Sequence, residues 1–210
     1  MKNTAFFICL FAIPVCMSCN NNAEEVNDKD SAIKRESTTA LNEVNDYADS
    51  VNKGLIADTM KGSPVRVATG NINGKHIQIE YGSPGVKGRT IWDSLVPYNK
   101  VWVTGAHHAT SISFSNDAVL GDKKITAGKY ALFTIPGKDS WTVILNKNYD
   151  QHQADEYKET EDVARITVQP EVNDKIVQRL TYSVDQTGEQ NGKIIIQWEK
   201  ISINIPVRFS

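Results

Sequence analysis

From Ser63 onward, apolar and polar residues alternate along the chain, and this period of two limits the fold more than any other feature. In the stretch 76–81, the apolar residues Ile77, Ile79 and Tyr81 fall on one face of an extended strand and the polar residues on the other. Similar stretches follow at 101–103, 110–115, 130–135, 141–145, 165–168, 176–184, 193–198 and 201–207. Many short alternating segments without a long helical pattern predict an all-β domain, an antiparallel β-sandwich of about nine strands.

Glycine, proline, asparagine and aspartate mark the turns between these strands. We expect turns at 121–122, 136–139, 173–174 and 188–192. The polar stretch 155–162 is typical of a loop or a short helix. The globular part, residues 63–210, is long enough to bury a core of its own, so we predict that it folds without the residues that precede it.

The first nineteen residues carry all three cysteines of the chain, Cys9, Cys16 and Cys19. Lys2 and the apolar run 5–17 are typical of a secretory signal, because the run is too short to span a bilayer. The residues around Cys19 resemble a bacterial lipobox, which implies removal of residues 1–18 as a lipoprotein signal peptide and acyl chains, palmitate among them, on Cys19. The expected location is the periplasm or the cell surface, with a lipid anchor in the outer membrane; an ordinary secretory signal is the alternative.

Residues 19–62 form a polar tether between the predicted anchor and the domain. An apolar stripe recurs there at three- and four-residue spacing and predicts a marginal helix; its members are Leu41, Val44, Ala48, Val51 and Leu55. We expect this helix to dock on the domain or to pair with a second copy, and the alternative is a partly disordered stalk. The formal net charge of −2 includes no basic excess, so nucleic acid is not an expected partner.

The connection 82–100 is long for a compact domain, and loops of this length are often functional. Small residues in the turn 104–109 let its backbone approach another group closely. Because the strand between these two segments is short, we expect them to lie against each other and to form the main polar depression of the domain. The alternative is a packed crossover that closes one end of the sandwich.

Several motifs in this central stretch are shared with a known family. They are Tyr81-Gly82-Ser83-Pro84-Gly85-Val86-Lys87-Gly88-Arg89, Val96-Pro97-Tyr98, Thr104-Gly105-Ala106 and Ala127-Gly128-Lys129-Tyr130. In these residues the chain resembles a family of bacterial exported proteins, many of them lipoproteins, catalogued as domain of unknown function 2911. The resemblance implies an all-β fold and no established activity. Val103 stands where the family commonly has arginine, and His107-His108 replaces a pair that is more often Asn-Glu.

The sequence offers little support for catalysis. It contains no nucleophile elbow, no phosphate-binding glycine loop, no dinucleotide fingerprint and no His-Glu-x-x-His motif, so no cofactor is expected. A weaker hypothesis is a metal site that uses His76, His107 and His108. Neighbouring residues on a strand point to opposite faces, so the two adjacent histidines share one ion only where the backbone is irregular. The alternative is that these histidines are solvated on the surface.

Anion binding is the better supported chemistry. Arg89 places a planar guanidinium in a flexible loop, and Tyr98 and Trp102 supply rings that stack on a sugar or another flat ligand. His107 and His108 complete the candidate ligand-binding residues. The alternative role for Arg89 is structural, as a partner of Asp93 or as a cap on a backbone carbonyl.

We therefore expect a membrane-anchored envelope lipoprotein that is a non-catalytic ligand-binding or interaction module for a small anion or a glycan. One alternative is a hydrolase or metal-dependent enzyme with its site near His107 and His108. That alternative requires a histidine within about 3 Å of a second titratable group. The other alternative is a structural envelope component, which predicts a closed, convex surface.

Overall fold

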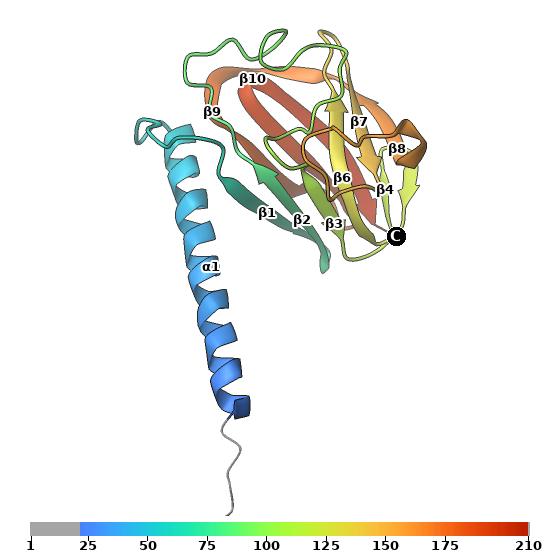
Figure 1. Ribbon diagram of the computed structural model, residues 1–210. Coiled ribbons are helices and arrows are strands. Elements are labelled where there is room, and N and C mark those ends of the chain that lie inside the picture. Colours follow the sequence, from blue (N-terminus) through green and yellow to red (C-terminus); the bar gives the residue numbers. More distant parts are fainter. Residues whose placement is uncertain (1–21, 210) are drawn as a thin grey trace, which may run out of the picture. The chain divides into compact units, whose positions relative to one another are not determined.

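The computed structural model describes residues 22–209 and contains one long helix and ten strands (Figure 1). The predicted signal peptide and Cys19 lie outside the described residues. The chain divides after Thr38 into two compact units, so helix α1 (Asn22–Asn52) contributes its first part to one unit and its second part to the other. The second unit, residues 39–210, holds all the strands. In the described part of the chain, no helix is long and apolar enough to cross a membrane.

The strands form two antiparallel sheets, of six and of four strands. The first sheet has the order β1 (Val65–Ile72), β2 (Lys75–Gly82), β3 (Ser111–Phe114), β6 (Gly128–Ile135), β7 (Trp141–Asn146) and β8 (Asp162–Val168). The second has the order β5 (Lys123–Ile125), β4 (Ala118–Leu120), β10 (Asn191–Phe209) and β9 (Pro170–Gln186). A short 3-10 helix, Glu159–Glu161, precedes β8 inside the stretch expected to be a loop or short helix.

The alternation of the sequence builds the core between these two sheets. On β2, Ile77, Ile79 and Tyr81 are buried while the residues between them are exposed. One continuous hydrophobic cluster joins such side chains of the first sheet to those of the second, including Leu180 and Phe209. The prediction of an all-β antiparallel sandwich is thus confirmed, with ten strands instead of about nine.

Several predicted boundaries on the second sheet are wrong. The stretches 193–198 and 201–207 are one strand, β10, whose pairing with β9 is irregular around Glu199, a residue with φ of 54°. Across this irregularity the inward-facing positions of β10 shift by one residue, from Ile196 and Trp198 before it to Ile203 and Ile205 after it, so the sequence resembles two strands. The turn expected at 173–174 lies inside β9, in an irregular stretch between the pairs Val172–Ile201 and Val177–Glu199.

Three short or polar strands escaped the sequence analysis, β1, β4 and β5. Conversely, the strand expected at 101–103 is reduced to a single bridge between Trp102 and Thr134. The backbone on both sides of Trp102 belongs to loops, so only Trp102 itself pairs with the neighbouring strand.

The predicted helix is present and continuous in its described part, α1. Of its apolar stripe, Ala48 and Val51 are buried in the second unit, Leu41 and Val44 are half-buried, and Leu55, just past the end of α1, is 71% exposed. Hydrogen bonds also attach this part of α1 to β1. Arg66 of β1 donates to Asn45 Oδ1 at 3.1 Å and to Asp49 Oδ1 at 2.6 Å. Residues 39–52 therefore dock on the sandwich, as one of the two sequence hypotheses proposed.

Candidate functional site

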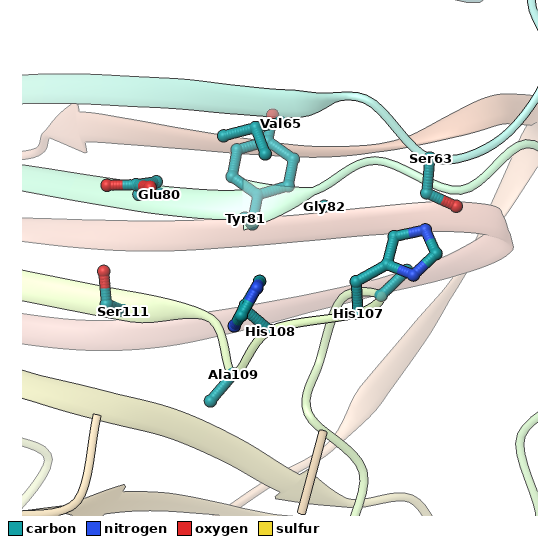
Figure 2. Close-up of a pocket in the computed structure, with 10 residues that line it drawn as sticks. Ser63, Val65, Glu80, Tyr81, Gly82, His107, His108, Ala109 and Ser111 are labelled. Atoms are coloured by element: carbon teal, nitrogen blue, oxygen red, sulfur yellow. The ribbon is translucent and has the colours of Figure 1, made fainter. Parts of the chain in front are cut away.

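Two pockets adjoin where the connection after β2 meets the turn 104–109. The β2 pocket has a volume of about 90 Å³ and is lined by Glu80, Tyr81, His107, His108 and Ser111, among others (Figure 2). The tryptophan pocket has a volume of about 260 Å³, and its lining includes Arg89, Trp102, His107, Gln153 and Trp198. Ser63, Ala106 and His107 line both pockets, so the turn stands as a partition between them.

The turn 104–109 has an unusual backbone that buried hydrogen bonds hold in place. Thr104 has φ of 52° and His107 has φ of 69°, in the left-handed region where a β-branched threonine is uncommon. The Thr104 carbonyl accepts hydrogen bonds from the Tyr182 hydroxyl at 2.6 Å and from Thr110 Oγ1 at 3.1 Å. Thr104 Oγ1 in turn donates to Thr134 Oγ1 at 3.0 Å. Strained backbone that its surroundings fix in this way is typical of binding sites.

The phenol of Tyr182 suits this role because it stays protonated. Complete burial of the side chain raises the pKa of Tyr182 well above its ordinary value of 10. Its hydroxyl therefore remains a hydrogen-bond donor to Thr104 throughout the physiological pH range. Burial also raises the pKa of Tyr81, whose ring lies 4.5 Å from that of Tyr182 and whose side chain lines the β2 pocket.

Two glycines beside the turn, Gly82 and Gly105, stand where the chain packs too closely for any side chain. A Cβ on Gly82 would lie 2.3 Å from the Ala106 carbonyl oxygen, and a Cβ on Gly105 would lie 2.6 Å from Thr110 Oγ1. Only glycine allows the end of β2 and the turn to pack at these distances. The small residues that marked this stretch in the sequence therefore bring the two walls of the β2 pocket together.

Residues 151–153, for which the sequence pattern predicts no element, support the other side of the turn. Gln153 N donates to the His107 carbonyl at 2.6 Å, and Ala109 N donates to the Gln151 carbonyl at 3.0 Å. Gln153 also has a left-handed φ, of 50°, and its side chain lines the tryptophan pocket. His152 faces His108 across a single β-bridge, with ring centroids 6.2 Å apart.

Arg89 is oriented by the loop that carries it. Its Nε donates to the Val86 carbonyl at 3.3 Å and its Nη2 donates to the Gly85 carbonyl, so the predicted carbonyl cap exists. Among residues 22–209, Nη1 of Arg89 makes no hydrogen bond and the guanidinium forms no ion pair with Asp93. One edge of the guanidinium therefore stays available at the exposed margin of the tryptophan pocket.

The inner wall of that pocket belongs to a cluster of all four tryptophans in the chain, Trp92, Trp102, Trp141 and Trp198. The rings of Trp102 and Trp198 stack with centroids 5.8 Å apart and an interplanar angle of 19°. The buried Nε1 of Trp198 has no hydrogen-bond acceptor among the described residues.

The structure brings some of the predicted site residues together and separates others. Arg89, Trp102 and His107 line the tryptophan pocket, while His107 and His108 line the β2 pocket. Tyr98 lines neither pocket, and Trp198 takes the place predicted for it beside Trp102. No local pattern marks Trp198 as a site residue, because it reaches the pocket from β10, about a hundred positions away along the chain.

The structure separates His76 from the other two histidines considered for a metal site. His76 lies near the start of β2, six residues before Gly82, a separation of about 20 Å along a strand. Within residues 22–209, no group of three or more His, Cys, Asp or Glu side chains is arranged to hold a metal ion. In the same range, neither His107 nor His108 forms a hydrogen bond through its ring, whereas His152, which faces His108, lies 3.0 Å from Asp155 with both side chains exposed.

Comparison with known proteins gives a family and no activity. Residues 63–207 match the family described as "Protein of unknown function (DUF2911)". No curated protein and no solved structure matches the chain. Because this match covers more than half of the sequence, the chain belongs to the DUF2911 family.

Proposed function

We propose that this chain is a membrane-anchored envelope protein whose β-sandwich binds a small organic anion in the tryptophan pocket. The observation that carries this proposal is the charge of the lining. Arg89 contributes its guanidinium, and no aspartate or glutamate is among the residues that line the pocket. The other polar lining groups include the side chains of Ser63, His107 and Gln153, each of which can donate a hydrogen bond.

The fixed orientation of Arg89 favours anion binding over a purely structural role. Two loop carbonyls hold Nε and Nη2, so the side chain loses little further conformational entropy when a ligand binds at Nη1. A guanidinium donates strong, charge-assisted hydrogen bonds to a carboxylate, sulfate or phosphate.

The aromatic wall favours a ligand that also has a flat or sugar-like face. The half-buried Trp102 offers apolar ring surface, and the buried Trp198 stacks behind it in the inner wall of the pocket. A volume of about 260 Å³ suits a molecule the size of a monosaccharide. A sugar acid, which combines a carboxylate with a pyranose face, has both features.

Binding is favoured over hydrolysis by the surroundings of the histidines. Catalysis by His107 or His108 requires a partner that orients the ring and a nucleophile within hydrogen-bond reach. In the described part of the chain, the histidine that contacts a carboxylate is His152, 3.0 Å from Asp155, and both side chains are exposed. The rigid turn thus supports recognition better than proton transfer.

Isothermal titration calorimetry of the purified chain tests the proposal, with glucuronate, acetate, phosphate and glucose as probes. We expect glucuronate to bind and Arg89→Gln to weaken its affinity by roughly tenfold or more, the effect of losing a charge-assisted hydrogen bond. Arg208→Gln, a change at an exposed arginine of β10, is the matched control and leaves the affinity unchanged. Equal affinities of the wild type and Arg89→Gln, or no binding of any anion, would exclude this function.

The anchor rests on the lipobox-like sequence around Cys19 and needs a separate test. We expect Cys19→Ala to move the protein from the membrane fraction to the soluble fraction, or to leave an uncleaved precursor, because the acyl chains have no other attachment site. Fractionation followed by mass spectrometry of the mature N-terminus measures both outcomes. A processed protein that stays with the membrane after this substitution contradicts the lipid anchor.

A further inference from the structure

Residues 53–62, here called the strap, connect α1 to β1 and are fastened by a buried arginine of β9. Arg179 is fully buried, and five hydrogen bonds match its five N–H donors. Nε and Nη2 donate to Asp58 Oδ1 at 3.0 and 2.8 Å, and Nη2 also donates to the Met60 carbonyl at 2.7 Å. Nη1 donates to the carbonyls of Gly62 at 3.4 Å and Ser83 at 2.9 Å. One side chain therefore holds both the strap and the start of the loop after β2.

The helix holds the strap from the other side. The hydroxyl of Tyr47 accepts hydrogen bonds from the backbone N–H groups of Thr59 at 2.7 Å and Met60 at 2.8 Å. Asn52 at the end of α1 pairs with the backbone of Arg179, accepting from its N–H at 2.7 Å and donating to its carbonyl at 3.0 Å. These contacts lie within the compact unit 39–210.

The strap also contacts the loop that carries Arg89. Lys87 Nζ donates to the Met60 carbonyl and lies 4.0 Å from Asp58 Oδ1. A Cβ on Gly85 would lie 2.4 Å from Asp58 Oδ2, so the loop backbone packs directly on the buried carboxylate. The Gly85 carbonyl at this contact is one of the two that orient the Arg89 guanidinium.

The strap thus reaches the tryptophan pocket from two directions. Ser63, the residue that follows the strap, lines both pockets. Pro84 and Arg89, which flank the loop segment packed on Asp58, line the tryptophan pocket. A shift of the strap moves these lining residues, although Tyr47, Asp58 and Arg179 line neither pocket.

We propose that the strap sets the anion affinity of the tryptophan pocket, with Tyr47, Asp58 and Arg179 as positioning residues. This inference rests on the function proposed above. Because coupling between two sites is reciprocal, an anion in the pocket stabilises the attachment of the strap to the same extent that the attached strap strengthens anion binding. Occupancy of the pocket is thereby linked to the last ten residues of the predicted tether.

Tyr47→Phe tests this link, because it removes the acceptor of two strap amides and leaves the pocket lining unchanged. We expect the glucuronate affinity to fall by roughly three- to tenfold, the effect of one or two weakened hydrogen bonds. Asp49→Asn is the matched control, two residues away on α1; it weakens the contact with Arg66 of β1, while the Asp49 side chain has no hydrogen bond to the strap or the loop. This control binds glucuronate as the wild type does.

Hydrogen exchange on the unaltered full chain gives a second readout that does not depend on a folded variant. We expect saturating glucuronate to slow the hydrogen exchange of the Thr59 and Met60 amides. The factor should be roughly the same as the factor by which Tyr47→Phe lowers the affinity for glucuronate. A strap with a merely structural role shows no such change. If glucuronate binds and Arg89→Gln weakens it, but Tyr47→Phe binds normally and exchange in the strap is unaltered, this inference is overturned and the proposed function stands. If the wild type binds none of the anions tested, both are overturned.

Discussion

Polar side chains are arranged in opposite ways in the strap around Arg179 and in the turn that carries His107. In the strap, every N–H donor of Arg179 has an acceptor, and the guanidinium is fully buried. In the turn, the backbone is held by buried hydrogen bonds, while the rings of His107 and His108 are exposed and form no hydrogen bond within residues 22–209. A buried guanidinium whose donors are all paired stabilises the fold, whereas unpaired side chains on a rigid backbone are available to a ligand.

Substitutions in the strap and in the turn should therefore differ in how much they change the free energy of unfolding and how much they change ligand binding. Removing one member of a buried ion pair leaves an uncompensated charge in the interior and is strongly destabilising. Removing an exposed, unpaired side chain changes the free energy of unfolding little, whatever it does to binding. The following predictions test this difference, from the largest expected change in stability to the smallest.

The largest effect is expected when the chain begins at Ser63 instead of Thr39. The sequence predicts that residues 63–210 fold alone, and the structure adds that this cut separates Asp58 from Arg179. We expect the shorter chain to lose about 3–5 kcal/mol of unfolding free energy, because it loses the burial of Val51 and the hydrogen bonds of Arg179 to residues 58–62. Urea denaturation of both chains measures the difference. Equal stabilities would mean that the strap does not contribute to the core.

Gly85→Ala tests the contact between the strap and the loop. The new Cβ would lie 2.4 Å from Asp58 Oδ2, so either the strap or the loop must move. We expect a loss of about 1–3 kcal/mol, as for overpacking in other protein interiors, measured by thermal or urea unfolding. Gly188→Ala is the control, because the nearest atom to its Cβ is Asn191 Nδ2 at 3.4 Å. A neutral Gly85→Ala would show that the loop is free to shift.

Tyr182→Phe tests the support of the turn. The substitution removes the hydrogen bond that Tyr182 donates to the Thr104 carbonyl. That carbonyl still accepts a hydrogen bond from Thr110 Oγ1. We expect a loss of about 0.5–1.5 kcal/mol in urea denaturation and faster hydrogen exchange of the Thr110 amide. Tyr130→Phe, which removes a hydroxyl contact to Thr126 away from the turn, serves as the control for exchange. Unchanged exchange at Thr110 would contradict the role assigned to Tyr182.

The smallest change in stability is expected for His107→Gly. Glycine adopts the φ of 69° without strain, and this gain offsets the greater freedom of the unfolded chain. We expect the unfolding free energy to change by less than about 1 kcal/mol, while glucuronate binding weakens because a donor leaves both pockets. If His107→Gly lowered the unfolding free energy as much as Gly85→Ala, His107 would be a residue that stabilises the fold, like those of the strap.

The parts of the fold that depend on local pattern could be predicted from the sequence. Alternation along β2 identified which residues face the core, and the length of the connection 82–100 pointed to one wall of the tryptophan pocket. Arg179 could not be recognised in this way, because its partner Asp58 lies 121 positions earlier and no periodicity connects them. Trp198 was missed for the same reason, since its role depends on how β10 passes the loops of the other sheet.

The clustering of all four tryptophans has a spectroscopic consequence. Trp92, Trp102, Trp141 and Trp198 lie close enough for excitation energy to pass between their rings, so the tryptophan emission of the chain comes from one coupled group of indoles. Two members of that group line the tryptophan pocket. A molecule that enters this pocket and quenches either ring therefore dims the emission of the whole protein, which makes the unlabelled chain its own optical reporter of occupancy.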